Sequence, residues 1–151
     1  MQLAALTRPD LIFPALEAHD RTVLLRVIAQ RLHDRGVVHD AADLFQRLEE
    51  RESLASTGIG GGVAVPHCKL DKLSEIVLAI AMVQGGVDFD APDEQPARLF
   101  FVIISPSHEP AAHLQCLAAI SKWVQGRGRV EHMLRLDSPE AIHQLLEEGD
   151  T

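Results

Sequence analysis

The chain has 151 residues, of which 46% are hydrophobic and 24% are charged, and its formal net charge at pH 7 is −8. This size and composition predict one globular domain over residues 1–151. The acidic balance argues against a nucleic-acid-binding face, and Cys68 and Cys116 are too few for a disulfide framework. The longest apolar run, residues 76–83, is too short to cross a bilayer, and the first residues lack the basic start of a signal peptide. We therefore expect a cytoplasmic protein.

Two helices are predicted in the first third of the chain. The first covers residues 20–35, because Asp20 is a good N-cap residue, Gly36 can end a helix, and apolar residues recur at helical spacing between them. The second covers residues 40–54, with three apolar side chains facing inward: Leu44, Phe45 and Leu48.

Four strands are predicted after a glycine-rich loop, over residues 63–65, 76–83, 87–90 and 99–104. The second and fourth are continuous apolar runs, which are typical of strands covered on both faces. Residues 87–90 alternate between apolar and acidic side chains and predict a short edge strand.

Three helices are predicted in the last third of the chain. Pro110 suits the first turn of a helix over residues 110–125, whose inner side is expected to consist of Leu114, Leu117, Ala118 and Val124. A short helix over residues 130–136 and a last helix that opens at Ser138 follow. Helices before, between and after strands predict an α/β sandwich, with a mixed central β-sheet flanked by helices.

Residues 57–67, with the sequence TGIGGGVAVPH, join a glycine-rich loop to a histidine that directly follows a proline. Glycines let backbone N–H groups approach an anion because no Cβ is in the way. No Lys-Ser/Thr pair follows the glycines, which excludes a P-loop, and Val63 stands where a dinucleotide-binding fingerprint has its third glycine. The pattern therefore favours a phosphoryl group carried on His67 over a bound nucleotide.

Residues 56–67 resemble the active-site signature of enzyme IIA proteins of the phosphotransferase system, in the fructose/mannitol class and its nitrogen-regulatory branch. Residues 113–121, with the sequence HLQCLAAIS, are similar to the segment that carries the second histidine of that family. Arg51 and Glu52 also match. The resemblance extends over nearly the whole chain and implies the sandwich fold of this class.

The resemblance implies a phosphoryl carrier that needs no cofactor. It implies that His67 is phosphorylated on Nε2, that Arg51 and His113 flank and stabilise the phosphate, and that a small phosphocarrier protein of the HPr/NPr type is the donor. Imidazole suits this relay because it is neutral and nucleophilic near pH 7. Amides of the glycine-rich loop are expected to hold the phosphate as well, and the candidate loop residues are Thr57, Gly58, Gly60, Gly61 and Gly62.

The residues taken alone leave competing interpretations open. His113, on an apolar helix, also fits a buried core histidine, and Arg51 near a helix C-terminus also fits a solvated charge that interacts with the helix dipole. If a strand continues through His67, alternation places Cys68 on the opposite face and Lys69 on the same face.

His113 and Cys116 are three residues apart on a predicted helix, a spacing that two metal ligands can share. The chain offers no second ligand pair with the spacing of a structural zinc site, so no metal is predicted.

The expected function is that of a nitrogen-regulatory phosphocarrier that acts on regulatory protein targets. The alternatives are a sugar-transport IIA protein that passes its phosphate to a IIB domain, and a module of the same fold that binds regulators without phosphorylation. Gly61 and Cys68 differ from the residues common at their positions in the family, which leaves the branch open.

Overall fold

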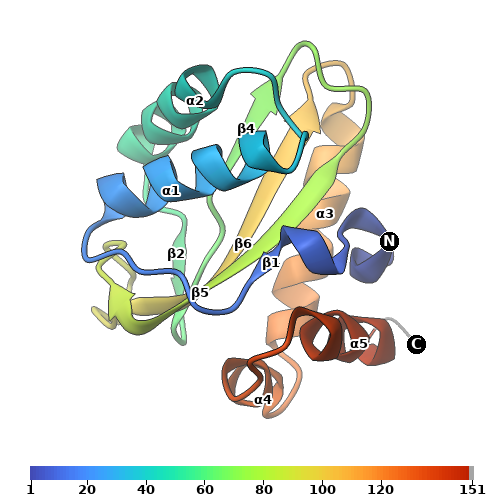
Figure 1. Cartoon of the computed structure of the whole chain (residues 1–151). Coiled ribbons are helices and arrows are strands. Elements are labelled where there is room, and N and C mark those ends of the chain that lie inside the picture. Colours follow the sequence, from blue (N-terminus) through green and yellow to red (C-terminus); the bar gives the residue numbers. More distant parts are fainter. Residues whose placement is uncertain (150–151) are drawn as a thin grey trace.

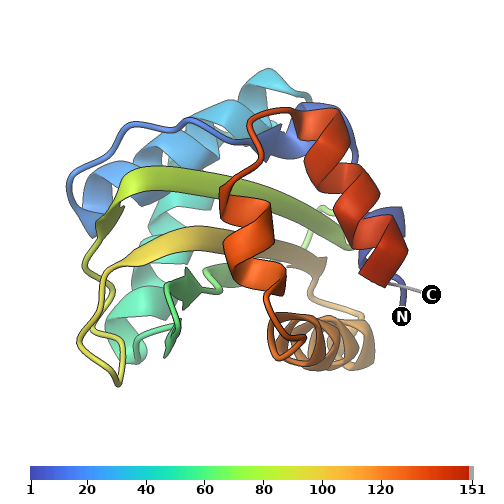
Figure 2. The same ribbon diagram turned by 90° about the horizontal axis from the view of Figure 1, so that it is seen from below.

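The computed structural model describes residues 1–149, so residues 150 and 151 of the predicted domain lie outside the described part. A mixed sheet, six-stranded within these residues, lies between two layers of helices (Figure 1). Helices α1 (Arg21–Asp34) and α2 (Ala41–Leu54) cover one face. Figure 2 shows the opposite face, covered by α3 (Pro110–Val124), α4 (Arg129–Leu134) and α5 (Pro139–Gly149). The predicted α/β sandwich with a mixed sheet is confirmed.

Two long antiparallel strands form the centre of the sheet, β5 (Val77–Val87) and β6 (Ala97–Pro106). Shorter strands extend it in the order β1-β5-β6-β3-β2, and β4 also pairs with β6. β1 is parallel to β5, β3 and β4 are parallel to β6, and β2 is antiparallel to β3. The bounds of the shorter strands are β1 (Ile12–Phe13), β2 (Gly58–Gly60), β3 (Val63–Ala64) and β4 (His67–Leu70).

β3 and β4 form one strand that is interrupted at Val65 and Pro66. Both are parallel to β6, and the offset between paired residues is the same in β3 as in β4. Pro66 has no N–H to donate to a sheet, but its carbonyl accepts a hydrogen bond from the Ile103 N–H at 3.0 Å. The strand therefore keeps its register across the proline and resumes at His67.

Side chains of β6 alternate between two hydrophobic cores, one on each face of the sheet. Phe100 and Val102 belong to the core beneath α1 and α2, here called the α2-side core. Phe101 and Ile103 belong to the core beneath α3, α4 and α5, here called the α3-side core. Coverage of both faces explains the continuous apolar runs in β5 and β6.

The N-terminal segment packs on the same layer as the last helix. The short 3-10 helices η1 (Leu3–Leu6) and η2 (Pro9–Leu11) contact α5, and His143 Nε2 lies 2.9 Å from the Ala4 carbonyl oxygen. Within residues 1–149, no helix combines the length and the apolar character needed to cross a membrane.

Aspartate caps start the first two long helices where they were predicted to start. Asp20 Oδ1 accepts a hydrogen bond from the Val23 N–H at 2.8 Å, and Asp40 Oδ1 accepts one from the Asp43 N–H at 3.1 Å. Each cap satisfies an N–H that has no partner within the helix.

The predicted inner face of α3 is right in two of its four residues. Leu117 and Val124 are partly buried and pack against the α3-side core, but Leu114 is 66% exposed and Ala118 is also exposed. The buried face consists of His113, Cys116, Ile120 and Trp123. The hydrophobic pattern missed this face because it begins with a polar histidine whose partner lies on the sheet.

The predicted edge strand over residues 87–90 is wrong beyond Val87, which is the last residue of β5. β5 continues through Val87 and then ends, and Asp90 has a φ of 50°, in the left-handed region that strands do not use. Phe89 is fully buried in the α2-side core. The alternation therefore reflects one buried anchor between two solvated aspartates.

Candidate functional site

His67 begins β4, directly after Pro66. Its Nδ1 lies 2.8 Å from the carbonyl oxygen of Val65. Because a carbonyl oxygen only accepts hydrogen bonds, Nδ1 carries the proton of the neutral ring and Nε2 keeps a free lone pair. The half-buried side chain lines a pocket, so the ring is held in place while one nitrogen stays free to react.

His113, in the first turn of α3, lies beside His67 on the α3 side of the sheet. The two ring centroids are 5.1 Å apart and the ring planes are inclined by 59°. His113 is 5% exposed, and its Nδ1 lies 2.5 Å from Ser105 Oγ on β6. The structure therefore brings together the two histidines singled out in the sequence. It also places His113 in the buried, hydrogen-bonded environment of a core histidine.

A pocket of about 380 Å³ adjoins both histidines. Side chains from α2, β4 and α3 line it: Arg47, Glu50, Arg51, Leu54, His67, Cys68, Lys69 and His113. Three of these are cations and one is a carboxylate, a balance that suits a phosphate. Arg51 Nη1 also donates to the Ala55 carbonyl oxygen at 3.0 Å, so this side chain lines the pocket and binds a carbonyl at its own helix end.

Burial lowers the pKa of both histidines. The pKa of His67 lies below its ordinary 6.5, first because of burial. The hydrogen bond that Nδ1 donates to the Val65 carbonyl opposes this change, and the charge of Arg51 adds to it. The pKa of His113 falls to about 4, again first through burial and then through His67, Lys69 and Arg51. Both rings are therefore neutral at pH 7, the form in which an imidazole can act as a nucleophile.

Glu52 and Thr57 form a clamp between the end of α2 and the start of β2. Glu52 is 5% exposed; its Oε2 accepts from the Thr57 N–H at 2.6 Å and its Oε1 accepts from the Thr57 hydroxyl at 2.7 Å. Thr57, expected to hold phosphate, thus directs both donors to Glu52. Sequence reasoning missed this clamp, because an acidic residue five positions before a threonine is too common a pattern to single out.

The candidate loop glycines do not line the His67 pocket. Gly60, Gly61 and Gly62 have positive φ; Gly60 ends β2, and Gly61 and Gly62 form the turn to β3. The Gly61 N–H donates to Asp93 Oδ2 at 2.9 Å, and the Gly58 N–H donates to the Ser56 hydroxyl at 3.0 Å. The turn precedes β3, and at the rise of a strand the four steps from Val63 to His67 span about 13 Å. An extended segment therefore separates the glycine turn from the histidine.

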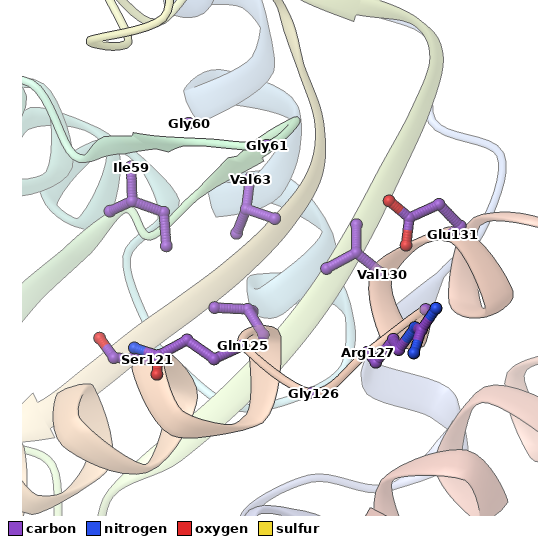
Figure 3. Close-up of a pocket in the computed structure, with 12 residues that line it drawn as sticks. Ile59, Gly60, Gly61, Val63, Ser121, Gln125, Gly126, Arg127, Val130 and Glu131 are labelled. Carbon is purple, nitrogen blue, oxygen red and sulfur yellow. The ribbon is translucent and has the colours of Figure 1, made fainter.

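The glycine turn instead lines a second pocket of about 490 Å³, between the β2–β3 hairpin and the turn from α3 to α4 (Figure 3). Ile59 and Gly61 lie on the hairpin side, and Gln125 and Arg127 lie on the helix side. Its lining has one arginine and one glutamate, so it lacks the excess of cations found beside His67.

A known protein family matches residues 5–149, the family described as phosphoenolpyruvate-dependent sugar phosphotransferase system, EIIA 2. The chain belongs to this family. It is therefore an EIIA phosphotransferase component, and its general function is that of a phosphocarrier.

Relatives of this EIIA chain include members of two branches. A fructose-specific EIIA component from Haloferax volcanii is 38% identical over 124 residues, which cover 82% of this chain and 77% of that protein. A nitrogen regulatory protein from Bradyrhizobium diazoefficiens is 31% identical over 146 residues, which cover 97% of this chain and 95% of that protein. The crystal structure of nitrogen regulatory protein IIA-Ntr from Neisseria meningitidis is similar with a TM-score of 0.88 at 27% identity, covering 95% of this chain and 97% of that one.

The residues that follow His67 in this EIIA chain alternate as predicted. Cys68 packs into the α2-side core, whereas Lys69 is exposed and lines the pocket. Burial raises the pKa of Cys68 to about 12 and that of Cys116 to about 12. Both thiols therefore stay protonated. Across the described part of the chain, no group of three or more His, Cys, Asp or Glu side chains is placed to hold a metal ion.

Proposed function

We propose that this EIIA chain accepts a phosphoryl group on Nε2 of His67 from a phosphocarrier protein of the HPr/NPr type. The observation that carries the proposal is the ring of His67, whose Nδ1 is held by Val65 while its Nε2 is free beside His113. The Nε2 lone pair forms the bond to phosphorus as the bond between phosphorus and the donor histidine breaks. The Nδ1 proton stays on the ring, and the Val65 carbonyl stabilises the positive charge that the ring gains.

Arg51 and His113 act in this proposal as stabilisers of the phosphoryl group. The guanidinium of Arg51 offers a planar fork of donors for phosphate oxygens, and Lys69 adds a further charge on the His67 side of the strand. His113 is too deeply buried to meet a partner protein by itself. Because phosphoryl transfer depends mainly on positioning and charge balance, these side chains suffice without a cofactor.

Exposed leucines support a protein as the donor. Leu54 is 81% exposed and lines the pocket, and Leu114 is 66% exposed and directly follows His113. Apolar side chains ringed by charged ones are the usual composition of a protein-binding surface. A partner seated on both leucines would place its phosphorylated side chain near His67.

For the output we propose the nitrogen-regulatory role, in which regulatory protein targets in the cytoplasm respond to the phosphorylation state of His67. The nearly end-to-end similarity to the nitrogen regulatory proteins from Bradyrhizobium diazoefficiens and Neisseria meningitidis supports this role. The competing function is sugar transport, with transfer to a cysteine of a IIB domain, and the 38% identity to the fructose-specific component favours it.

The test is incubation of the purified chain with phosphoenolpyruvate, enzyme I and the carrier protein, followed by intact mass spectrometry. We expect a gain of one phosphate that is labile in acid and stable in base. His67→Ala abolishes the gain, and His132→Ala, which changes an exposed histidine on α4, retains it. No gain with donors that phosphorylate another IIA protein would refute the proposal and favour a module that acts by contact alone.

A second incubation separates the two branches. The phosphorylated chain is mixed with a fructose-type IIB domain, and the phosphate is followed by mass. Rapid transfer to the IIB cysteine supports the sugar-transport function, and retention of the phosphate on the chain supports the regulatory one.

A further inference from the structure

Ser105 is a fully buried polar residue in the site that the phosphocarrier function leaves without a role. Its side chain leaves β6 on the α3 side of the sheet, two residues after Ile103 of the α3-side core. Its Oγ lies 2.5 Å from Nδ1 of His113, which is also buried. A polar pair kept out of water in this way needs to be fully hydrogen-bonded.

The balance of donors and acceptors decides the direction of this hydrogen bond. Among the hydrogen bonds of the described residues, Ser105 Oγ has one partner, His113 Nδ1. If Nδ1 carried the proton and donated it, the serine O–H would be buried with no acceptor, which is costly. If the serine donates, its hydrogen is satisfied and Nδ1 is the acceptor. The proton of neutral His113 then resides on Nε2.

We infer that Ser105 is a positioning residue: its hydroxyl donates to Nδ1 of His113, fixes the neutral ring as the Nε2–H tautomer, and so keeps an N–H available for the phosphoryl group on His67. The inference rests on the proposed function of His67. In this inference His113 is a neutral hydrogen-bond donor, and Ser105 on β6 determines which of its two ring nitrogens carries the proton.

The two histidines then have opposite tautomers for opposite tasks. A carbonyl, which only accepts, holds the proton of His67 on Nδ1 and leaves Nε2 free to attack. A hydroxyl that donates holds the proton of His113 on Nε2 and makes it a donor. With the other tautomer of His113, a lone pair would face the phosphate oxygens and repel them. The low pKa of His113, about 4, agrees with a ring that stays neutral.

Nitrogen NMR tests the tautomer directly. Long-range ¹H–¹⁵N correlations of the imidazole rings distinguish protonated from bare nitrogens, and His113→Gln assigns the signals. We expect bare Nδ1 and protonated Nε2 in the unphosphorylated wild-type chain at neutral pH. In Ser105→Ala we expect a mixture of tautomers, and in Ser105→Thr, which keeps the hydroxyl, the wild-type pattern. Ser107→Ala changes an exposed serine two residues further along and is the matched control.

Transfer kinetics test the consequence. Ser105 is buried and does not touch the donor, so Ser105→Ala should lower kcat for phosphorylation of His67 about threefold to tenfold, the range of one neutral hydrogen bond, and leave KM for the carrier unchanged. Thermal unfolding of each variant verifies that it is folded.

Protonated Nδ1 in the wild-type ring would overturn the inference, as would a Ser105→Ala chain with the wild-type tautomer and the wild-type kcat. Because the tautomer is measured without phosphate, this result stands apart from the proposed function. A wild-type chain that shows the expected tautomer but takes up no phosphate would overturn the function of His67 and leave the Ser105–His113 hydrogen bond in place.

Discussion

Replacing Thr57 with valine should measurably destabilise the fold. Valine keeps the shape of the side chain but removes the hydroxyl that donates to Glu52 Oε1 at 2.7 Å, so a carboxylate that is 5% exposed loses one of its two partners. Hydrogen bonds to charged groups contribute about 1.5–3 kcal/mol. For a chain of this length, 1 kcal/mol shifts Tm by about 2–4 °C, so we expect Tm to fall by about 3–12 °C.

Thermal and urea unfolding of Thr57→Val measure this loss, and Thr22→Val is the control. Thr22 is exposed on α1, where the same replacement should change stability by less than about 0.5 kcal/mol. Glu52→Gln, alone and combined with Thr57→Val, completes a double-mutant cycle that isolates the coupling between the two side chains. A Thr57→Val chain as stable as Thr22→Val, with no coupling to Glu52, would show that the clamp contributes nothing.

Two further predictions concern the site. The pKa of His113 falls from 6.5 to about 4 on folding, so between these pH values the unfolded chain binds a proton that the folded chain does not, and the free energy of unfolding should decline by up to about 3 kcal/mol as pH falls from 6.5 to 4. Unfolding measured at several pH values should show a shallower decline in His113→Gln than in the wild-type chain. Equal slopes would contradict the argument that burial lowers this pKa. Leu114→Glu should raise KM for the carrier about fivefold or more with little change in kcat, because a charge replaces an apolar contact at the surface that meets the partner. The control Ile59→Glu, at an exposed apolar position on the β2–β3 hairpin, should leave KM unchanged. Equal KM values for both variants would contradict a docking surface around Leu114.

Features encoded in short stretches of sequence could be predicted for this chain. Asp20 and Asp40 start their helices through bonds to residues three positions ahead, and such local signals are readable. The alternation of Cys68 and Lys69 about the strand followed from its period of two. The proximity of His67 and His113 came from the resemblance of their segments to a family, since nothing local joins a strand to a distant helix.

Features that depend on tertiary partners were missed. A buried His113 was one of two open alternatives, but the partner that holds it, Ser105 on β6, was not predicted because neither residue signals the other along the chain. The glycine turn was expected at the phosphate because glycine-rich loops often bind anions, but the hairpin turns away before the strand reaches His67. Glu52 and Thr57 meet only because α2 ends beside β2.

The broken strand that carries His67 also bears on solubility. β4 pairs with β6 on one side and, within the described residues, has no strand partner on the other, so it lies at an edge of the sheet. Open edges invite strands of other copies to add on and to aggregate. Here the open edge is four residues long, follows a proline that cannot donate to a neighbouring strand, and carries a lysine. The surface around His67 can thus remain accessible to partner proteins while strands of other copies are kept from pairing with β4.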